Sequence, residues 1–181
     1  MTTRSPSRPV NTRSGAARMP ARVALPQANL EMIRHSMSVG MCRALKVRLT
    51  RLSRRGVQAE MTVSEDHINR TGRVNGGVLM AFADVIGAIG TVANLPEGHR
   101  TTTLESKTNF FAAGAGPRIL ARSVPLHIGR TTMVWQTTVS NLDGTRVAIV
   151  TQTQIVIPAR SEAPAPAAAP AAARARRRKA G

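Results

Sequence analysis

Residues 75–94 read NGGVLMAFADVIGAIGTVAN, and the rest of the chain is organised around this stretch. Asn75 belongs to the residue types favoured at helix N-caps, and the residues after it are apolar on every face of a helix. A helix that is apolar all round is buried on all sides or spans a membrane. The apolar run is shorter than the roughly 20 residues that a membrane span needs. The stretch therefore predicts a buried helix that ends near Asn94.

Asp84 is the only ionisable side chain in this predicted helix. A lone carboxylate in apolar surroundings is costly to ionise, and buried carboxylates are candidates for acid–base chemistry. The alternative interpretation is a structural Asp84 that accepts hydrogen bonds from a neighbouring loop. The helix by itself favours neither interpretation over the other.

The segments after the helix alternate between apolar and polar residues and are joined by short turns. They predict four strands, over residues 100–111, 118–128, 131–140 and 145–157. Consecutive strands with short connections cannot be parallel, because parallel neighbours need long crossovers. These strands therefore predict an antiparallel sheet.

The segments before the helix add a short helix and a hairpin. Apolar residues at steps of three and four predict a helix over residues 27–41. Two alternating segments, 44–52 and 57–63, flank a turn and predict a hairpin. A polar loop over residues 64–74 leads to the start of the central helix, where a functional site is expected. The predicted fold class is α+β, with an antiparallel sheet of about five to six strands wrapped around one central apolar helix.

The chain of 181 residues has room for one domain, predicted over residues 27–158, and two tails. Residues 1–26 mix Arg, Ser and Pro, and residues 159–181 are rich in Ala, Pro and Arg, so both are predicted to be disordered. They carry more than half of the net charge of +17, and the excess in the domain favours an anionic ligand. The basic C-terminal cluster is interpreted as a nucleic-acid contact or as a solvated tail, and we favour the latter.

Metal and disulfide chemistry have little support in the sequence. The single cysteine, Cys42, excludes an internal disulfide and a cysteine-cluster metal site. His35, His99 and His127 are scattered and make no metal-ligand spacing. We therefore expect no metal and no cofactor.

The residues before and within the central helix resemble a known family. Asn69, the triplet Asn75-Gly76-Gly77 and Asp84 are spaced like the signature of PaaI-type (phenylacetate-pathway-like) acyl-CoA thioesterases, which have the hotdog fold. The similarity covers about residues 45–157. It implies hydrolysis of acyl-CoA and assembly into dimers, often dimers of dimers. One departure is that Asn75 stands where the family usually has a His, and Asn cannot titrate.

The predicted chemistry combines a carboxylate with a helix N-terminus. Free backbone N–H groups and a positive dipole end there favour a developing oxyanion, so Gly76 is the predicted donor and Gly77 a lesser candidate. Asp84 is then the general base on water, or a nucleophile that forms a transient anhydride. The resemblance implies that Asn69 holds the water or the thioester and that Thr103 places a hydroxyl near the carboxylate. Asn75, Gly77 and Thr103 are the predicted substrate-binding residues.

Two loop side chains, Asp66 and His67, are interpreted as polar groups of the loop rather than catalysts.

The spacing also predicts the assembly. Asp84 lies eight residues after Gly76, roughly 12 Å along a helix, which is too far for both to act on one carbonyl. A two-fold dimer with antiparallel helices would bring Asp84 of one subunit beside Gly76 of the other. We therefore predict a homodimer with composite sites at the subunit interface. The resemblance implies the same, with a homotetramer as the larger assembly and acyl-CoA as the substrate. We also expect a cytoplasmic protein with no membrane partner. The alternatives are a non-catalytic acyl-CoA-binding or regulatory protein, suggested by Asn75, and a nucleic-acid contact through the basic tails.

Overall fold

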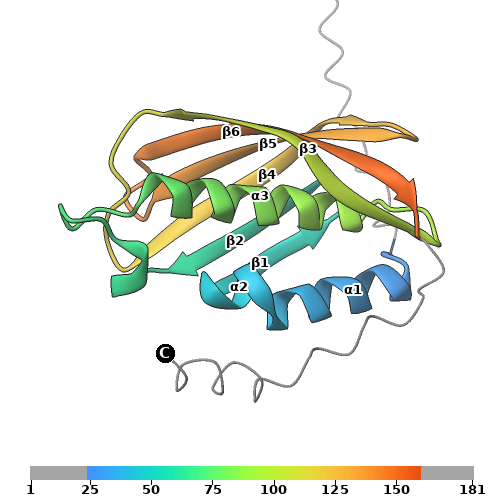
Figure 1. Cartoon of the computed structure of the whole chain (residues 1–181), viewed down its shortest axis with the longest axis horizontal. Coiled ribbons are helices and arrows are strands. Elements are labelled where there is room, and N and C mark those ends of the chain that lie inside the picture. Colours follow the sequence, from blue (N-terminus) through green and yellow to red (C-terminus); the bar gives the residue numbers. More distant parts are fainter. Residues whose placement is uncertain (1–23, 160–181) are drawn as a thin grey trace, which may run out of the picture.

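The computed structural model describes residues 24–159, which form a six-stranded antiparallel sheet wrapped around one long helix (Figure 1). The sheet order is β1-β2-β4-β5-β6-β3, and every neighbouring pair is antiparallel. The predicted α+β hotdog architecture is therefore confirmed. Apart from residues 24–26 and 159, the predicted tails 1–26 and 159–181 lie outside the described residues. The elements are α1 (Gln27–Ser38), α2 (Gly40–Ala44), β1 (Val47–Ser53), β2 (Gly56–Thr62), η1 (Glu65–His67), α3 (Gly76–Val92), β3 (His99–Phe110), β4 (Arg118–Ile128), β5 (Thr132–Asn141) and β6 (Arg146–Pro158).

Two asparagines, Asn75 and Asn94, flank the central helix α3 and bond its ends. The Asn75 side chain accepts a hydrogen bond from the Gly77 N–H at 2.8 Å, so the predicted N-cap is confirmed. At the other end, the Asn94 amide donates to the carbonyl oxygens of Gly90 at 2.8 Å and Arg54 at 3.0 Å. The last carbonyls of a helix have no partner within the helix, so this side chain completes the end of α3 and ties it to the β1–β2 turn.

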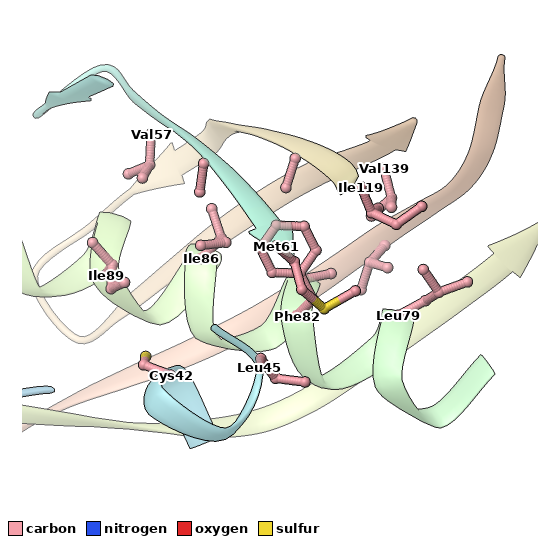
Figure 2. Packing of buried hydrophobic residues seen from close by; sticks show 14 of the residues in the cluster. Cys42, Leu45, Val57, Met61, Leu79, Phe82, Ile86, Ile89, Ile119 and Val139 are labelled. Atoms are coloured by element: carbon pink, nitrogen blue, oxygen red, sulfur yellow. The ribbon is translucent and has the colours of Figure 1, made fainter. Parts of the chain in front are cut away.

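The core lies between α3 and the inner face of the sheet, where Phe82 and Ile86 of α3 are fully buried (Figure 2). They pack in one cluster with Met61 of β2, Ile119 of β4 and Val139 of β5. These strand residues alternate with outward-facing neighbours, as the period of a strand requires. Burial of such large side chains is worth about 1.5–3 kcal/mol each, so this layer is the main stabilising contact of the domain.

Two glycines let α3 approach the sheet closely. A Cβ on Gly87 would lie 2.5 Å from the Gln152 side chain, and a Cβ on Gly90 would lie 2.8 Å from the Trp135 ring. Glycine inside a helix costs roughly 1 kcal/mol relative to alanine. The close helix–sheet packing explains why α3 carries glycine at these positions.

Two expectations from the sequence were wrong. The predicted helix over residues 27–41 is broken at Val39, whose backbone is extended (φ −129°, ψ 171°), and Gly40 after it has a positive φ of +51°. The central helix is not buried on all sides, because the sheet and the two short helices leave one stripe open. Met80 is 39% exposed, and Asp84 on the same stripe is only half-buried.

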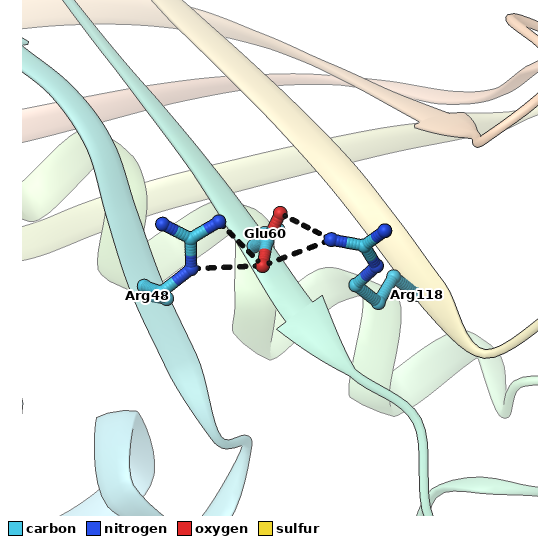
Figure 3. A network of polar contacts seen from close by, with 3 residues as sticks. All are labelled: Arg48, Glu60 and Arg118. Carbon is cyan, nitrogen blue, oxygen red and sulfur yellow. Dashed lines mark hydrogen bonds and ion pairs between the residues drawn. The ribbon is translucent and has the colours of Figure 1, made fainter.

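The outer face of the sheet carries a compact ionic cluster around Glu60 (Figure 3). Arg48 of β1 lies 2.9 Å from Glu60 Oε1, and Arg118 of β4 lies 3.2 Å from Oε2. The hydrogen bond from Arg48 is the main cause that lowers the pKa of Glu60, and Arg118 contributes further. The cluster links three adjacent strands, β1, β2 and β4.

We expect Glu60→Gln to destabilise the fold near neutral pH and to have no effect in acid. A carboxyl whose pKa is lowered in the folded state contributes stability above its unfolded value, ordinarily 4.5. This contribution is lost as the pH falls through the folded pKa. Urea denaturation at several pH values should therefore show a gap in unfolding free energy between the wild type and Glu60→Gln. This gap narrows below pH 4.5 and closes as the pH falls through the lowered folded pKa. Glu97→Gln, an exposed change in the loop after α3, should show no such gap. A gap that persists in acid would contradict the assignment.

Candidate active site

The first turn of α3 presents backbone N–H groups that the helix itself does not use. Asn75 Oδ1 already accepts from the Gly77 N–H, so Gly77 is not available as an oxyanion donor in this chain. The Gly76 N–H donates to no acceptor within residues 24–159. The Phe110 ring lies beside this position, 3.3 Å from where a Cβ on Gly76 would be. Of the two predicted donors, only Gly76 is unoccupied.

Asp84 faces β3 and β6, where two polar side chains contact it and a third contacts one of these two. Thr103 of β3 donates its hydroxyl to Asp84 Oδ1 at 3.0 Å. Gln152 of β6 donates its amide to the Asp84 carbonyl oxygen at 3.0 Å and to Oδ1 at 3.3 Å. Gln154 donates to Thr103 Oγ1 at 2.7 Å. The predicted pair of Asp84 and Thr103 is therefore in direct contact, and Asp84 Oδ2 accepts no hydrogen bond from the described residues.

Asn69 is used by its own loop. Its Oδ1 accepts from the Thr71 N–H at 2.9 Å, the Thr71 hydroxyl at 2.7 Å and the Arg73 N–H at 3.1 Å. Such side-chain bonds to the backbone a few residues on shape turns. No hydrogen bond joins Asn69 to Gly76 or to Asp84.

His67 connects the same loop to α2. It is 4% exposed, its Nδ1 accepts from the Ser64 N–H at 3.2 Å, and its Nε2 lies 3.0 Å from the Ala44 carbonyl oxygen. These contacts place the ring hydrogen on Nε2, which donates to that carbonyl. Asp66, next to it, is exposed. Both ring nitrogens of His67 are thus occupied by the loop and by α2.

The sequence reasoning missed Gln152 and Gln154. Both are fully buried, on the same face of β6 as Val150 and Val156. Two amides at alternating positions of an otherwise apolar strand face are unusual, because a buried polar group needs a partner. That pattern, V-x-Q-x-Q-x-V over residues 150–156, was a signal that could have identified them.

Other candidate chemistry is absent from the described region. Cys42 is buried, and burial raises the pKa of its thiol, which makes it a poor nucleophile. Residues 24–159 hold no group of three or more His, Cys, Asp or Glu side chains placed to bind a metal ion. None of the helices in this part of the chain is long and apolar enough to cross a membrane.

Two surface cavities lie on the face of the sheet turned away from α3. One of about 160 Å³ is lined by Arg51, Arg55 and Arg122 with their neighbours. The other, of about 520 Å³, spreads over β2, β4 and β5 towards Arg146. Neither is lined by a residue of α3 or β3, so neither adjoins Asp84 or Gly76.

Solved structures with the same architecture include thioesterases. A mutant thioesterase from Pseudomonas aeruginosa is 25% identical and superposes with a TM-score of 0.66, covering 71% of this chain and 94% of that chain. The PaaI protein from the phenylacetic acid degradation operon of E. coli is 20% identical, with a TM-score of 0.66 over 75% of this chain and 98% of that chain. The fold is therefore the hotdog fold of these thioesterases.

Sequence comparison finds one matching family and several related proteins. Residues 71–148 match the profile of the Thioesterase superfamily. A Haemophilus influenzae protein named "Putative esterase" is 30% identical over 80 residues, which are 44% of this chain and 58% of that relative. A Vibrio cholerae protein of the same description is 24% identical over 132 residues, or 73% of this chain and 88% of that protein. Residues 71–148, which run from the loop before α3 into β6, thus match the thioesterase superfamily, in agreement with the resemblance seen in the sequence.

We expect Asn75→Ala to destabilise the domain by about 1 kcal/mol, because it removes the N-cap bond to Gly77. The reason is that one of the first N–H groups of α3 would lose its only acceptor. Equilibrium urea denaturation measures the change. Asn75→Ser keeps a capping oxygen and should retain most of the stability, so equal losses in the two variants would contradict the capping role.

Proposed function

We propose that this protein is an acyl-CoA thioesterase, which hydrolyses the thioester of an aryl- or fatty acyl-CoA to the free acid and CoA. The observation that carries the proposal is the placement of Asp84. Its carboxylate lies half-buried beside β3, with one oxygen bound by Thr103 and Gln152 and the other without a partner in the described chain. A donor N–H without an acceptor stands at the start of the same helix, on Gly76.

The chemistry proceeds from these two groups. Asp84 takes a proton from water that attacks the thioester carbon, or attacks that carbon itself to form an anhydride that water then cleaves. Either attack places negative charge on the thioester oxygen. The Gly76 N–H and the positive end of the α3 dipole stabilise that charge, and its collapse expels the CoA thiolate.

The two groups act on one thioester only if two subunits combine. They are roughly 12 Å apart along α3, so a single chain holds half of each site. We infer a two-fold dimer in which Gly76 of one subunit faces Asp84 of the partner subunit.

The free edge of the sheet supports this assembly. Within the described residues β3 pairs only with β6, which leaves its other edge open over His99–Phe110. An open edge of this length is a template for pairing with another chain. Large apolar side chains are exposed along it, with Leu104 59%, Phe110 49% and Phe111 59% exposed. Pairing of two β3 strands around a two-fold axis would cover this apolar edge and the open stripe of α3 that carries Met80 and Asp84.

We expect Asp84→Asn to abolish thiol release from acyl-CoA while the dimer persists. The amide has nearly the shape of the carboxylate but cannot accept the proton or attack the carbonyl. Thiol release from a panel of aryl and fatty acyl-CoAs, measured beside size-exclusion chromatography, tests this. Undiminished turnover in Asp84→Asn would remove this residue from the mechanism.

Binding of acyl-CoA by the wild type without any hydrolysis would instead favour a non-catalytic protein.

Gly76→Pro should lower kcat by about 10²–10³-fold, because it deletes the donor N–H. Proline is well tolerated at the first position of a helix, and Asn75 before it has the extended backbone (φ −64°, ψ 139°) that a residue preceding proline prefers. Gly76→Ala is the matched control, since it brings the same Cβ towards Phe110 but keeps the N–H. Equal losses in the two variants would indicate a steric effect rather than a lost donor.

Mixed dimers test whether the site is shared. An Asp84→Asn subunit and a Gly76→Pro subunit are each inactive as homodimers, but one of the two sites in the mixed dimer combines intact Gly76 with intact Asp84. Differently tagged subunits allow the mixed dimer to be purified, and we expect about half of the wild-type kcat per dimer. No recovered activity would contradict a site built from two subunits.

A further inference from the structure

Two glutamine side chains lie fully buried beneath α3. Gln152 and Gln154 are 0% exposed and share the inner face of β6 with apolar neighbours. A buried amide costs free energy unless its donor and acceptor groups find partners. The hydrogen bonds of both amides lead to one group, the Asp84 carboxylate.

Gln152 contacts Asp84 directly, at its carbonyl oxygen and at Oδ1. Both of these atoms only accept hydrogen bonds, so the amide nitrogen must face them. Gly87 leaves the space for this contact, because a Cβ there would lie 2.5 Å from the amide carbon of Gln152. The opposite amide oxygen has no partner among the described residues, so the side chain is held by its bonds to Asp84 alone.

Gln154 acts on Asp84 through Thr103. Its amide donates to Thr103 Oγ1 at 2.7 Å, and the Thr103 hydroxyl hydrogen is then free to point only towards Asp84 Oδ1 at 3.0 Å. The Gln154 Oε1 lies 3.0 Å from the Thr101 hydroxyl, whose single hydrogen is shared with the Ile155 carbonyl oxygen at 2.8 Å. The Gln154 amide and the Thr103 hydroxyl therefore both donate in the direction of the Asp84 carboxylate.

We infer that Gln152 and Gln154 are positioning residues for hydrolysis, which hold Asp84 by Oδ1 and leave Oδ2 as the reacting oxygen. The inference rests on the proposed role of Asp84. A carboxylate fixed by two donors needs no reorganisation before it meets water or the thioester, which is where such contacts contribute to rate. Buried amides serve this purpose without adding a second charge beside the acid.

The kinetic test replaces each amide with an apolar side chain of similar length. Gln152→Met and Gln154→Met should lower kcat by about 10- to 100-fold with little change in KM, because they affect the reacting group and not substrate affinity. Thr103→Val should lose kcat similarly, and Thr103→Ser should restore most of it. Thr153→Val makes the same hydroxyl-to-methyl change on the outward face of β6 and serves as the matched control.

A double-mutant cycle separates positioning from packing. Because Gln154 reaches Asp84 only through Thr103, the Gln154→Met loss in kcat should disappear in a Thr103→Val background. The Gln152→Met loss should persist there, since Gln152 contacts Asp84 itself. Additive losses for Gln154 and Thr103 would overturn the proposed chain of contacts.

A spectroscopic readout does not depend on activity. The chain has three aspartates, Asp66, Asp84 and Asp143, so the ¹³C carboxyl signal of Asp84 can be assigned by its loss in Asp84→Asn. We expect the chemical shift of this signal to change in Gln152→Met and Gln154→Met and to stay the same in Thr153→Val. An unmoved signal in both glutamine variants would overturn the positioning role. Absence of thiol release by the wild type, with a signal that moves, would instead contradict the proposed hydrolysis.

Discussion

The close approach of α3 to the inner face of the sheet is the contact on which the rest of the structure depends. Gly87 and Gly90 leave no side chain between the helix and the strands beneath it, so Gln152 and Trp135 reach the helix surface. Without this approach, Asp84 would not meet the amide of Gln152, and the Thr103 hydroxyl could not bridge to it from β3. The close packing of α3 on the sheet therefore determines both the burial of its apolar residues and the orientation of Asp84.

The sequence predicted most of the fold because its patterns are local. Alternation over residues 131–140 and 145–157 identified β5 and β6, and the Asn75 cap with its apolar run identified α3. The break after Ser38 was missed, because helical spacing of apolar residues continues across Val39 and Gly40, whose backbones leave the helical conformation. The half-exposure of Asp84 was missed too, since no local pattern reports which side of a helix the sheet leaves open.

The candidate site was less accessible to sequence reasoning because it depends on contacts between distant segments. Thr103 was identified by resemblance, and its contact with Asp84 is present. Gln152 and Gln154 lie 68 and 70 residues after Asp84, and only the pairing of β3 with β6 brings them under α3. At position 75 the structure shows how the departure from the family pattern is accommodated, because an asparagine still caps the helix with its own side chain. What that side chain lacks is a proton to exchange near neutral pH.

The burial of Trp135 means that the intrinsic fluorescence of the protein reports on its interior. It is the single tryptophan of a sequence without tyrosine, and it is fully enclosed against Gly90 near the end of α3. Ultraviolet-excited emission of the protein therefore arises from one indole in the interior. Gly90 lies six residues beyond Asp84, roughly 9 Å along the helix, so a change in that emission reports on how the far end of α3 sits on the sheet rather than on the acid itself.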